Sequence, residues 1–235
     1  MRRILGALLL LASFAFAGAA PAQTRVGAPL PPAQGANEKS LAARAQAALD
    51  AKQWGDAEAA LKQLASSEPR WEYAEALGNA QINQGHYEDS IASYQRAIEM
   101  AQKNAAPAAV GQIYTMIGNA NLKLKKNDAA IAAYEKAAAL DPNPAVAYFN
   151  MCATLYNIGQ TVKTIAACDK AIAADPKKAD AYFVKGSVMV GQGAVGKNGK
   201  YTVPSGTVET LKQYLVLAPG GGHAEEVKQM LDLLK

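Results

Sequence analysis

Apolar and small residues recur at helical spacing along most of this chain, and the pattern repeats with a period of 34 residues between positions 111 and 176. Residues of the same kind stand 34 apart: Tyr114, Tyr148 and Tyr182; Gly118, Cys152 and Gly186; Ala137 and Ala171; Pro142 and Pro176. A period of this length is typical of stacked supersecondary units rather than of one globular core. Each unit is predicted to be two helices separated by a short break.

These units resemble the tetratricopeptide repeat. The resemblance is carried by a small residue in the first helix, and by an alanine, an aromatic residue and a closing proline in or after the second: Gly118, Cys152, Gly186, Ala130, Tyr134, Ala137 and Pro142. It implies an all-α solenoid of about five helix–turn–helix repeats. We expect a repeat domain over 37–235, with repeats at about 37–70, 71–106, 107–144, 145–178 and 179–219. The first is degenerate, as terminal repeats tend to be.

The fifth repeat is interrupted. Its second helix is expected to start at Thr207, nine residues later than the period requires, which leaves an insert at 194–206. Within the insert, Asn198-Gly199 lies between two β-prone arms over 195–203, a strong signal for a β-hairpin. An isolated hairpin is marginal in water, so it must lean on neighbouring helices or a partner. An amphipathic capping helix is expected at 222–234.

The first 22 residues have the pattern of a secretory signal peptide: two arginines, an apolar run of about 14 residues and a small-x-small cleavage site. The run is shorter than the roughly 20 residues of a membrane span, and no cysteine follows it for lipid attachment. The mature protein is therefore expected to be soluble, periplasmic or secreted. Residues 23–36, rich in Pro, Gly and Ala, are predicted to be a disordered leader; a partner-binding role for residues 29–32 is the alternative.

Composition narrows the function. Hydrophobic residues make up 50% of the chain and aromatic residues only 7%, which suits closely packed helices. The formal net charge of +4 falls by two, to +2, if Arg2 and Arg3 leave with the signal peptide. Such a weak balance does not favour nucleic acid or an anionic membrane surface as a partner.

Candidate chemistry is sparse. His86 and His223 are the two histidines, and neither has a metal-ligand neighbour at useful spacing. There is no phosphate-binding loop after a strand and no nucleophile elbow. We therefore expect no enzyme activity, no cofactor and no metal.

The two cysteines are more informative. Cys152 falls in the first helix of the fourth repeat and Cys168 in the second, and the mean of their positions is 160, inside the expected turn at Gln160. Facing residues of an antiparallel helix pair have a constant index sum, so the two should meet. In an exported protein this favours a disulfide. Two free, packed thiols are the alternative.

The resemblance also implies a site, because the first helices of the family line a concave groove that holds a peptide of another protein. The groove residues that we single out are Asn79, Ile82, Asn119, Leu122, Phe149, Tyr156, Asn157 and Phe183; Val146 and Asn150 belong to the wider groove-facing set. The Lys and Arg of the family's carboxylate clamp are missing, and Glu75 stands where its first Lys would be. Alternatively, the aromatic residues only fill contacts between repeats.

Together these features predict an exported, non-catalytic scaffold or adaptor that binds a peptide segment of a protein partner in its groove, in a cell-envelope assembly. The mechanism would be complementarity of shape and side chains on a preformed surface. The alternative is a structural protein that assembles with copies of itself through the 195–203 hairpin and the terminal cap.

Overall fold

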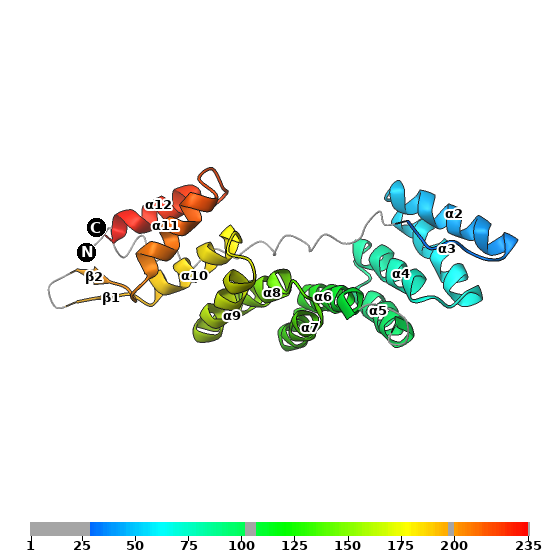
Figure 1. The fold of residues 1–235 in the computed structure, drawn as a ribbon, viewed down its shortest axis with the longest axis horizontal. Helices are drawn as coiled ribbons and strands as arrows, with labels where there is room; N and C mark the ends of the chain where they lie inside the picture. The colour runs from blue at the N-terminus through cyan, green and yellow to red at the C-terminus, as the bar shows by residue number, and fades with distance from the viewer. Residues whose placement is uncertain (1–28, 102–106, 197–199, 235) are drawn as a thin grey trace. The chain divides into compact units, whose positions relative to one another are not determined.

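The structure is a computed structural model that describes residues 29–101, 107–196 and 200–234, and these are almost entirely helical (Figure 1). Contacts divide them into two compact units, residues 29–142 and 143–234. The predicted all-α fold, with a short hairpin in the last repeat and a final helix, is confirmed. The predicted signal peptide, 1–22, lies outside the described residues.

The first unit consists of three antiparallel helix pairs, each with a first and a second helix. Its helices are α2 (Ala36–Asp50), α3 (Trp54–Ser67), α4 (Trp71–Asn83), α5 (Tyr87–Ala101), α6 (Pro107–Lys123) and α7 (Asn127–Leu140). Each first helix also packs on the second helix of the preceding pair, as α4 does on α3 and α6 on α5. This nearest-neighbour packing is how a repeat array buries its apolar faces.

The second unit continues the same arrangement and ends with the interrupted repeat. Its elements are α8 (Ala145–Asn157), α9 (Thr161–Ala174), α10 (Ala179–Gly191), β1 (Ala194–Val195), β2 (Tyr201–Thr202), α11 (Thr207–Leu217) and α12 (Ala224–Leu233). The strands pair antiparallel, with Ala194 opposite Thr202. The Tyr201 hydroxyl donates to the Val190 carbonyl at 2.6 Å, so the hairpin does lean on α10.

One packing rule recurs inside the pairs: a small residue in the first helix faces a large one in the second. A Cβ on Gly78 would lie 2.5 Å from the Tyr94 ring, and one on Gly118 would overlap the Tyr134 ring. Only glycine permits such close approach, which explains the small residue of the 34-residue period.

The turns inside the pairs also repeat. Lys52, Gly85, Lys125 and Gly159 occupy the same place in four successive repeats, and all have positive φ, between 54° and 81°. A left-handed residue at this position ends the first helix and redirects the chain into the second. In two of the four repeats this residue is a lysine, and its Cβ makes the left-handed conformation less favourable than it is for glycine.

The structure differs from the predicted disordered leader, 23–36, at its C-terminal end. Residues 29–35 pack on the first unit, with Ala33 buried, and α2 begins at Ala36. The physical reason is that Leu30 finds apolar partners on two core clusters and the backbone finds polar side chains. Residues 23–28 lie outside the described part.

Candidate peptide-binding surface

The predicted asparagines of the first unit have partners inside their own repeats. Asn79 directly follows Gly78, and its Oδ1 accepts a hydrogen bond of 2.8 Å from the Tyr94 hydroxyl. Asn119 follows Gly118 and accepts from Tyr134 in the same way, also at 2.8 Å. Burial raises the pKa of both tyrosines, so both stay protonated donors.

These contacts limit what the two asparagines can offer a peptide. Asn79 is only 6% exposed, so its side chain forms part of the packing between α4 and α5 and presents little surface to a ligand. Asn119 is half-buried, and its carbonyl oxygen already has a donor. The signal was present in the sequence, because a tyrosine follows each of the two asparagines by 15 residues.

The apolar members of the predicted set remain accessible. Ile82 on α4 and Leu122 on α6 occupy equivalent positions near the ends of their helices, and both are half-buried. The next residues, Asn83 and Lys123, are exposed. This part of the first unit therefore presents partly exposed apolar side chains beside polar ones, as a peptide-binding surface does.

The second unit places its predicted residues in different surroundings. Phe149 is buried, and the ammonium group of Lys178 lies 5.0 Å from the centre of its ring. Tyr156 is half-buried; burial raises its pKa, and the negative charge of Glu226 on α12 raises it further. Asn157 is exposed. Of these three residues, Asn157 and Tyr156 have surface to offer a ligand.

Phe183 belongs to the interface with the cap. Its ring stacks on His223 at 3.8 Å between centroids and lies 5.8 Å from Tyr214, and the residue is only 3% exposed. One turn along α10, the Ser187 hydroxyl lies 3.9 Å from the sulfur of Met230 on α12. Residues of the chain's own C-terminal segment cover this position, so little of the Phe183 side chain is exposed to a peptide.

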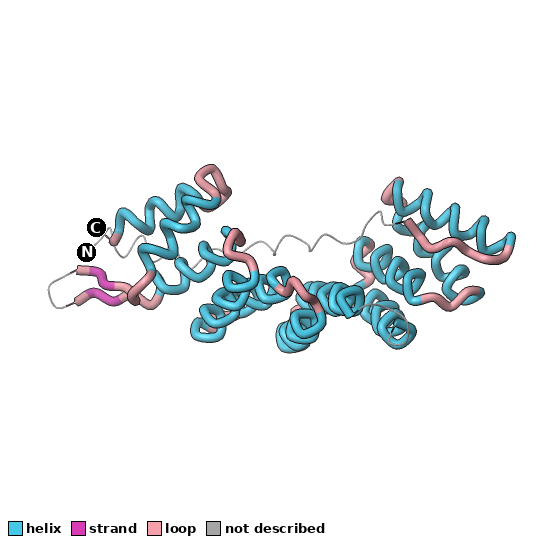
Figure 2. Tube along the Cα trace, in the orientation of Figure 1, coloured by secondary structure: helices cyan, strands magenta, loops and turns pink. Residues whose placement is uncertain are grey.

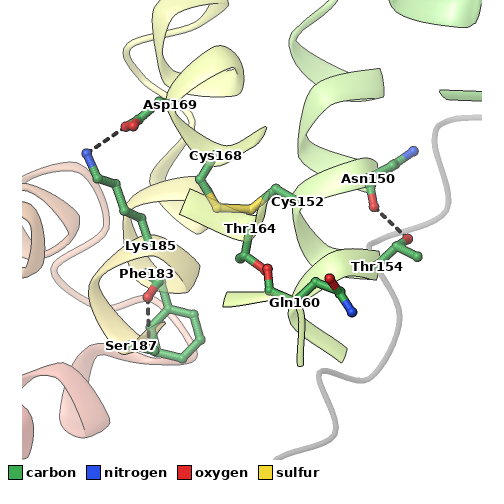
Figure 3. The surroundings of a disulfide bond; sticks show 10 residues. All are labelled: Asn150, Cys152, Thr154, Gln160, Thr164, Cys168, Asp169, Phe183, Lys185 and Ser187. Atoms are coloured by element: carbon green, nitrogen blue, oxygen red, sulfur yellow. Dashed lines mark hydrogen bonds and ion pairs between the residues drawn. A yellow bond between two sulfur atoms is a disulfide. The ribbon is translucent and has the colours of Figure 1, made fainter. Parts of the chain in front are cut away.

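Asn150 on α8 is the residue that the selected set left out. It is 2% exposed, and its Nδ2 is the one buried side-chain polar atom among the described residues that lacks a hydrogen-bond partner. In Figure 3 its side chain points away from the disulfide, while the Thr154 hydroxyl bonds to its backbone oxygen at 2.8 Å. Val146, which is 43% exposed, and Asn157 share this side of α8.

The predicted disulfide is confirmed. Cys152 on α8 and Cys168 on α9 are bonded, with Cα atoms 5.1 Å apart, and both residues are fully buried (Figure 3). The bond crosses the helix pair at its middle and joins the two halves of the fourth repeat. It therefore holds α8, which carries Asn150, against α9.

A depression lies among α5, α6 and α7, with a cavity volume of about 480 Å³. Ile98, Tyr114 and Ile117 form apolar walls, and Glu99 and Lys136 lie at the charged rim. Tyr114 and Ile117 lie on a different side of α6 from Leu122, so the depression is separate from the predicted groove.

Other kinds of site find no support in the part of the chain that the structure describes. Among residues 29–101, 107–196 and 200–234, no three His, Cys, Asp or Glu side chains gather closely enough to hold a metal ion. No helix in those same ranges combines the length and apolar character of a bilayer span.

Antiparallel helix pairs with the same internal contacts in successive pairs define an α-solenoid repeat protein. Its sequence matches two family models, both described as tetratricopeptide repeat, over residues 42–107 and 111–144. The chain contains tetratricopeptide repeats, as the resemblance predicted.

Solved structures share this fold. MamA, known from a crystal structure, shares 22% sequence identity with this chain, with a TM-score of 0.64. The match covers 79% of this chain and 94% of the MamA chain. MamA 41-end from Desulfovibrio magneticus RS-1 is 20% identical, with a TM-score of 0.64 and coverage of 81% and 99%. YrrB, described as a TPR protein with an unusual peptide-binding site, is 18% identical, with a TM-score of 0.60 and coverage of 83% and 94%. A comparison with curated proteins found no match.

Proposed function

We propose that this chain is an exported, non-catalytic scaffold that binds a peptide segment of a protein partner in a cell-envelope assembly. Membership of a family of interaction scaffolds supports the binding role, as does the peptide-binding site of YrrB, a protein of the same fold. The signal-peptide pattern of residues 1–22 supports export to the periplasm or beyond.

The observation that carries the proposal is the unpartnered amide of Asn150. A buried donor without an acceptor costs about 1–3 kcal/mol, and native proteins seldom leave one in this state without a reason. Because Asn150 is only 2% exposed, its side chain would first turn outward, and a backbone carbonyl of a bound peptide would then accept from Nδ2 and remove that cost. The exposed Val146 and Asn157 on the same side of α8 would contact the side chains of that peptide.

Apart from an outward turn of the buried Asn150 side chain, binding here would use a surface that already exists before the partner arrives. The disulfide ties α8 to α9, so little ordering of the surface is needed on binding. A preformed site reduces the entropy lost on association, which is the main cost that contacts must exceed. The donor at Asn150 would fix the peptide backbone, and neighbouring side chains would select its sequence.

The test is a selection of peptides from a displayed library by the full chain, followed by the variant Asn150→Leu. Leucine has similar volume and no donor, so the variant should be as stable as the wild type or up to about 1–3 kcal/mol more stable. It should bind the selected peptides at least about tenfold more weakly, a loss of about 1.4 kcal/mol.

The matched control is Asn121→Leu on α6. Asn121 is also buried, but its Nδ2 donates to the Ile117 carbonyl at 2.9 Å, so its amide has a partner inside the helix. This control should lose stability and keep peptide affinity. Selected peptides that bind Asn150→Leu as tightly as the wild type would disprove a role for this surface.

A further inference from the structure

Residues 29–35, here called the leader strap, lie along the first helix pair before the chain enters α2. Figure 2 shows the strap as a loop running alongside α2. The Leu30 amide donates to Gln46 Oε1 on α2 at 2.8 Å. Since Leu30 meets residue 46 and Gly35 precedes residue 36, the strap runs antiparallel to the helix.

Two backbone carbonyls of the strap accept hydrogen bonds from side chains at the start of α4. Tyr73 on α4 donates its hydroxyl to the Pro31 carbonyl at 3.0 Å, and Arg70 donates to the Pro32 carbonyl at 3.2 Å. Two carboxylates hold the guanidinium of Arg70 in turn, Glu68 at 3.7 Å and Glu72 at 3.5 Å. Side chains from two separate helices thus converge on one short extended segment.

Leu30 is the apolar anchor of the strap. It packs against two core clusters, one that includes Leu49 and Leu61 and another that includes Leu41 and Leu64. Burying a leucine side chain is a substantial favourable term in peptide binding. The site therefore combines apolar contacts to Leu30 with polar side chains that bind the adjoining backbone.

The sequence of the strap matches what these side chains can satisfy. Leu30, Pro31 and Pro32 contain a single N–H group, because proline has none, and Gln46 accepts from it. The two proline rings restrict the backbone before binding, so less conformational entropy is lost when the segment docks. The contacts recognise a leucine followed by two prolines in extended conformation.

The strap lies on the side of the first repeat that corresponds to the predicted groove. Gln46 directly follows Ala45, as Asn79 follows Gly78 and Asn119 follows Gly118, and all three small residues face the second helix of their pair. Gln46 therefore has the register of the predicted groove residues. In this repeat a segment of the chain itself occupies that side.

We propose that the surface formed by Gln46, Arg70, Tyr73 and the apolar residues that contact Leu30 is a binding site for extended Leu-Pro-Pro segments. The strap fills it in cis, and a segment of the same chemistry in trans occupies it when the strap leaves. This deepens the proposed function at a second place. Asn150 lies in the other unit, so either proposal can fail while the other stands.

Because the strap is covalently attached, it competes with free peptides for the site. The strap runs directly into α2 at Ala36, so its effective concentration at the site is about millimolar or higher. A free peptide must exceed that concentration to compete with the strap in the wild-type protein. Weakening the strap should consequently uncover the site to peptides at much lower concentration.

The experiment uses a fluorescently labelled peptide with the sequence of residues 29–35 (PLPPAQG) and the full chain. A released variant, Leu30→Ser/Pro31→Gly/Pro32→Gly, should bind the peptide at least about tenfold more tightly than the wild type in fluorescence anisotropy. Adding Tyr73→Phe, which removes the donor to the peptide carbonyl, should weaken that binding about fivefold. Pro29→Gly, at an exposed position, should behave like the wild type.

Circular dichroism establishes that each variant is folded. If the released variant is folded and binds the peptide no more tightly than the wild type, the strap only stabilises the first repeat and the inference is wrong. The wild-type protein supplies a second test that needs no variant. Excess unlabelled peptide should shift the Leu30 and Ala33 amide resonances to random-coil positions, and unchanged resonances at about ten times the effective concentration would also overturn it.

Discussion

Cys168 is bonded to Cys152 at the two positions that Tyr134 and Gly118 occupy one repeat earlier. In the third repeat the Tyr134 ring lies against Gly118, and its hydroxyl donates to Asn119. In the fourth repeat the disulfide joins the corresponding two helices, α8 and α9, and Ala153 stands where Asn119 would be. The second and third repeats thus have an asparagine that accepts from the buried tyrosine. The fourth repeat has no tyrosine at the equivalent position and no asparagine to accept from it.

The first prediction replaces the disulfide of the fourth repeat by the glycine, asparagine and tyrosine of the third. Replacing both cysteines by alanine should lower the free energy of unfolding by roughly 3 kcal/mol, the value expected for closing a loop of about 15 residues. Cys152→Gly/Ala153→Asn/Cys168→Tyr, which installs the set of the third repeat, should recover most of that loss. Urea denaturation measures both. A triple variant no more stable than the double alanine variant would show that the fourth repeat cannot accept the ring.

The second prediction compares two hydroxyl deletions. Tyr94→Phe leaves the acceptor of Asn79 without a donor in a buried place and should cost about 1–3 kcal/mol of unfolding free energy. Tyr134→Phe should cost less, about 0.5–1 kcal/mol, because Asn119 is half-buried and water can reach it. Thermal and urea unfolding of the two variants, side by side, tests this order. The reverse order would contradict the proposed difference in burial.

The third prediction concerns pH and Glu58 on α3. Burial raises the pKa of Glu58, but hydrogen bonds from Lys62, Gln84 and Gln81 outweigh burial, so the net pKa lies below the usual 4.5. A carboxyl whose pKa is lowered by folding stabilises the protein fully above its unfolded-state pKa, and this contribution falls as pH drops through the folded value.

Glu58→Gln should accordingly reduce the loss of stability between pH 7 and pH 3. Urea denaturation at both values, on wild type and variant, measures the difference. Equal pH dependence in wild type and Glu58→Gln would contradict the prediction.

The fourth prediction concerns the turns inside the helix pairs. Lys125 has φ of 58°, where Gly85 and Gly159 serve in other repeats. Lys125→Gly should raise the free energy of unfolding by about 0.5–1 kcal/mol, because the left-handed conformation disfavours a Cβ by more than the extra freedom of unfolded glycine costs. The converse, Gly159→Ala, should cost a similar amount. A Cβ there would meet no atom within 4 Å, so a loss of stability would report backbone strain alone.

Sequence reasoning was most successful where one rule applies to every repeat. The 34-residue period, the small residues and the closing prolines express nearest-neighbour packing, which local sequence largely determines. The disulfide followed from the same logic, since two residues equally far from a turn face each other in a helix pair. Each of these inferences needed only the geometry of one repeat.

The sequence says less about the site, because the surroundings of each predicted residue depend on which other segment covers it. Phe183 has the spacing of a groove residue, but His223, 40 residues later, stacks on it. Asn79 has a side chain that could bind a peptide backbone, but its Oδ1 accepts a hydrogen bond from the Tyr94 hydroxyl. Helical periodicity tells which side of a helix a residue occupies and does not tell which other segment packs there.

The amino-acid sequence by itself determined the repeat architecture, the place of the interrupted repeat and the pairing of Cys152 with Cys168, because these depend on contacts within a repeat or between neighbours. Only the tertiary structure decided that residues 29–35 dock on the first repeat and that Asn150 retains an unpartnered amide. Both outcomes depend on side chains brought together from separate helices, such as Gln46 and Tyr73, and the composition of a single segment does not contain that information.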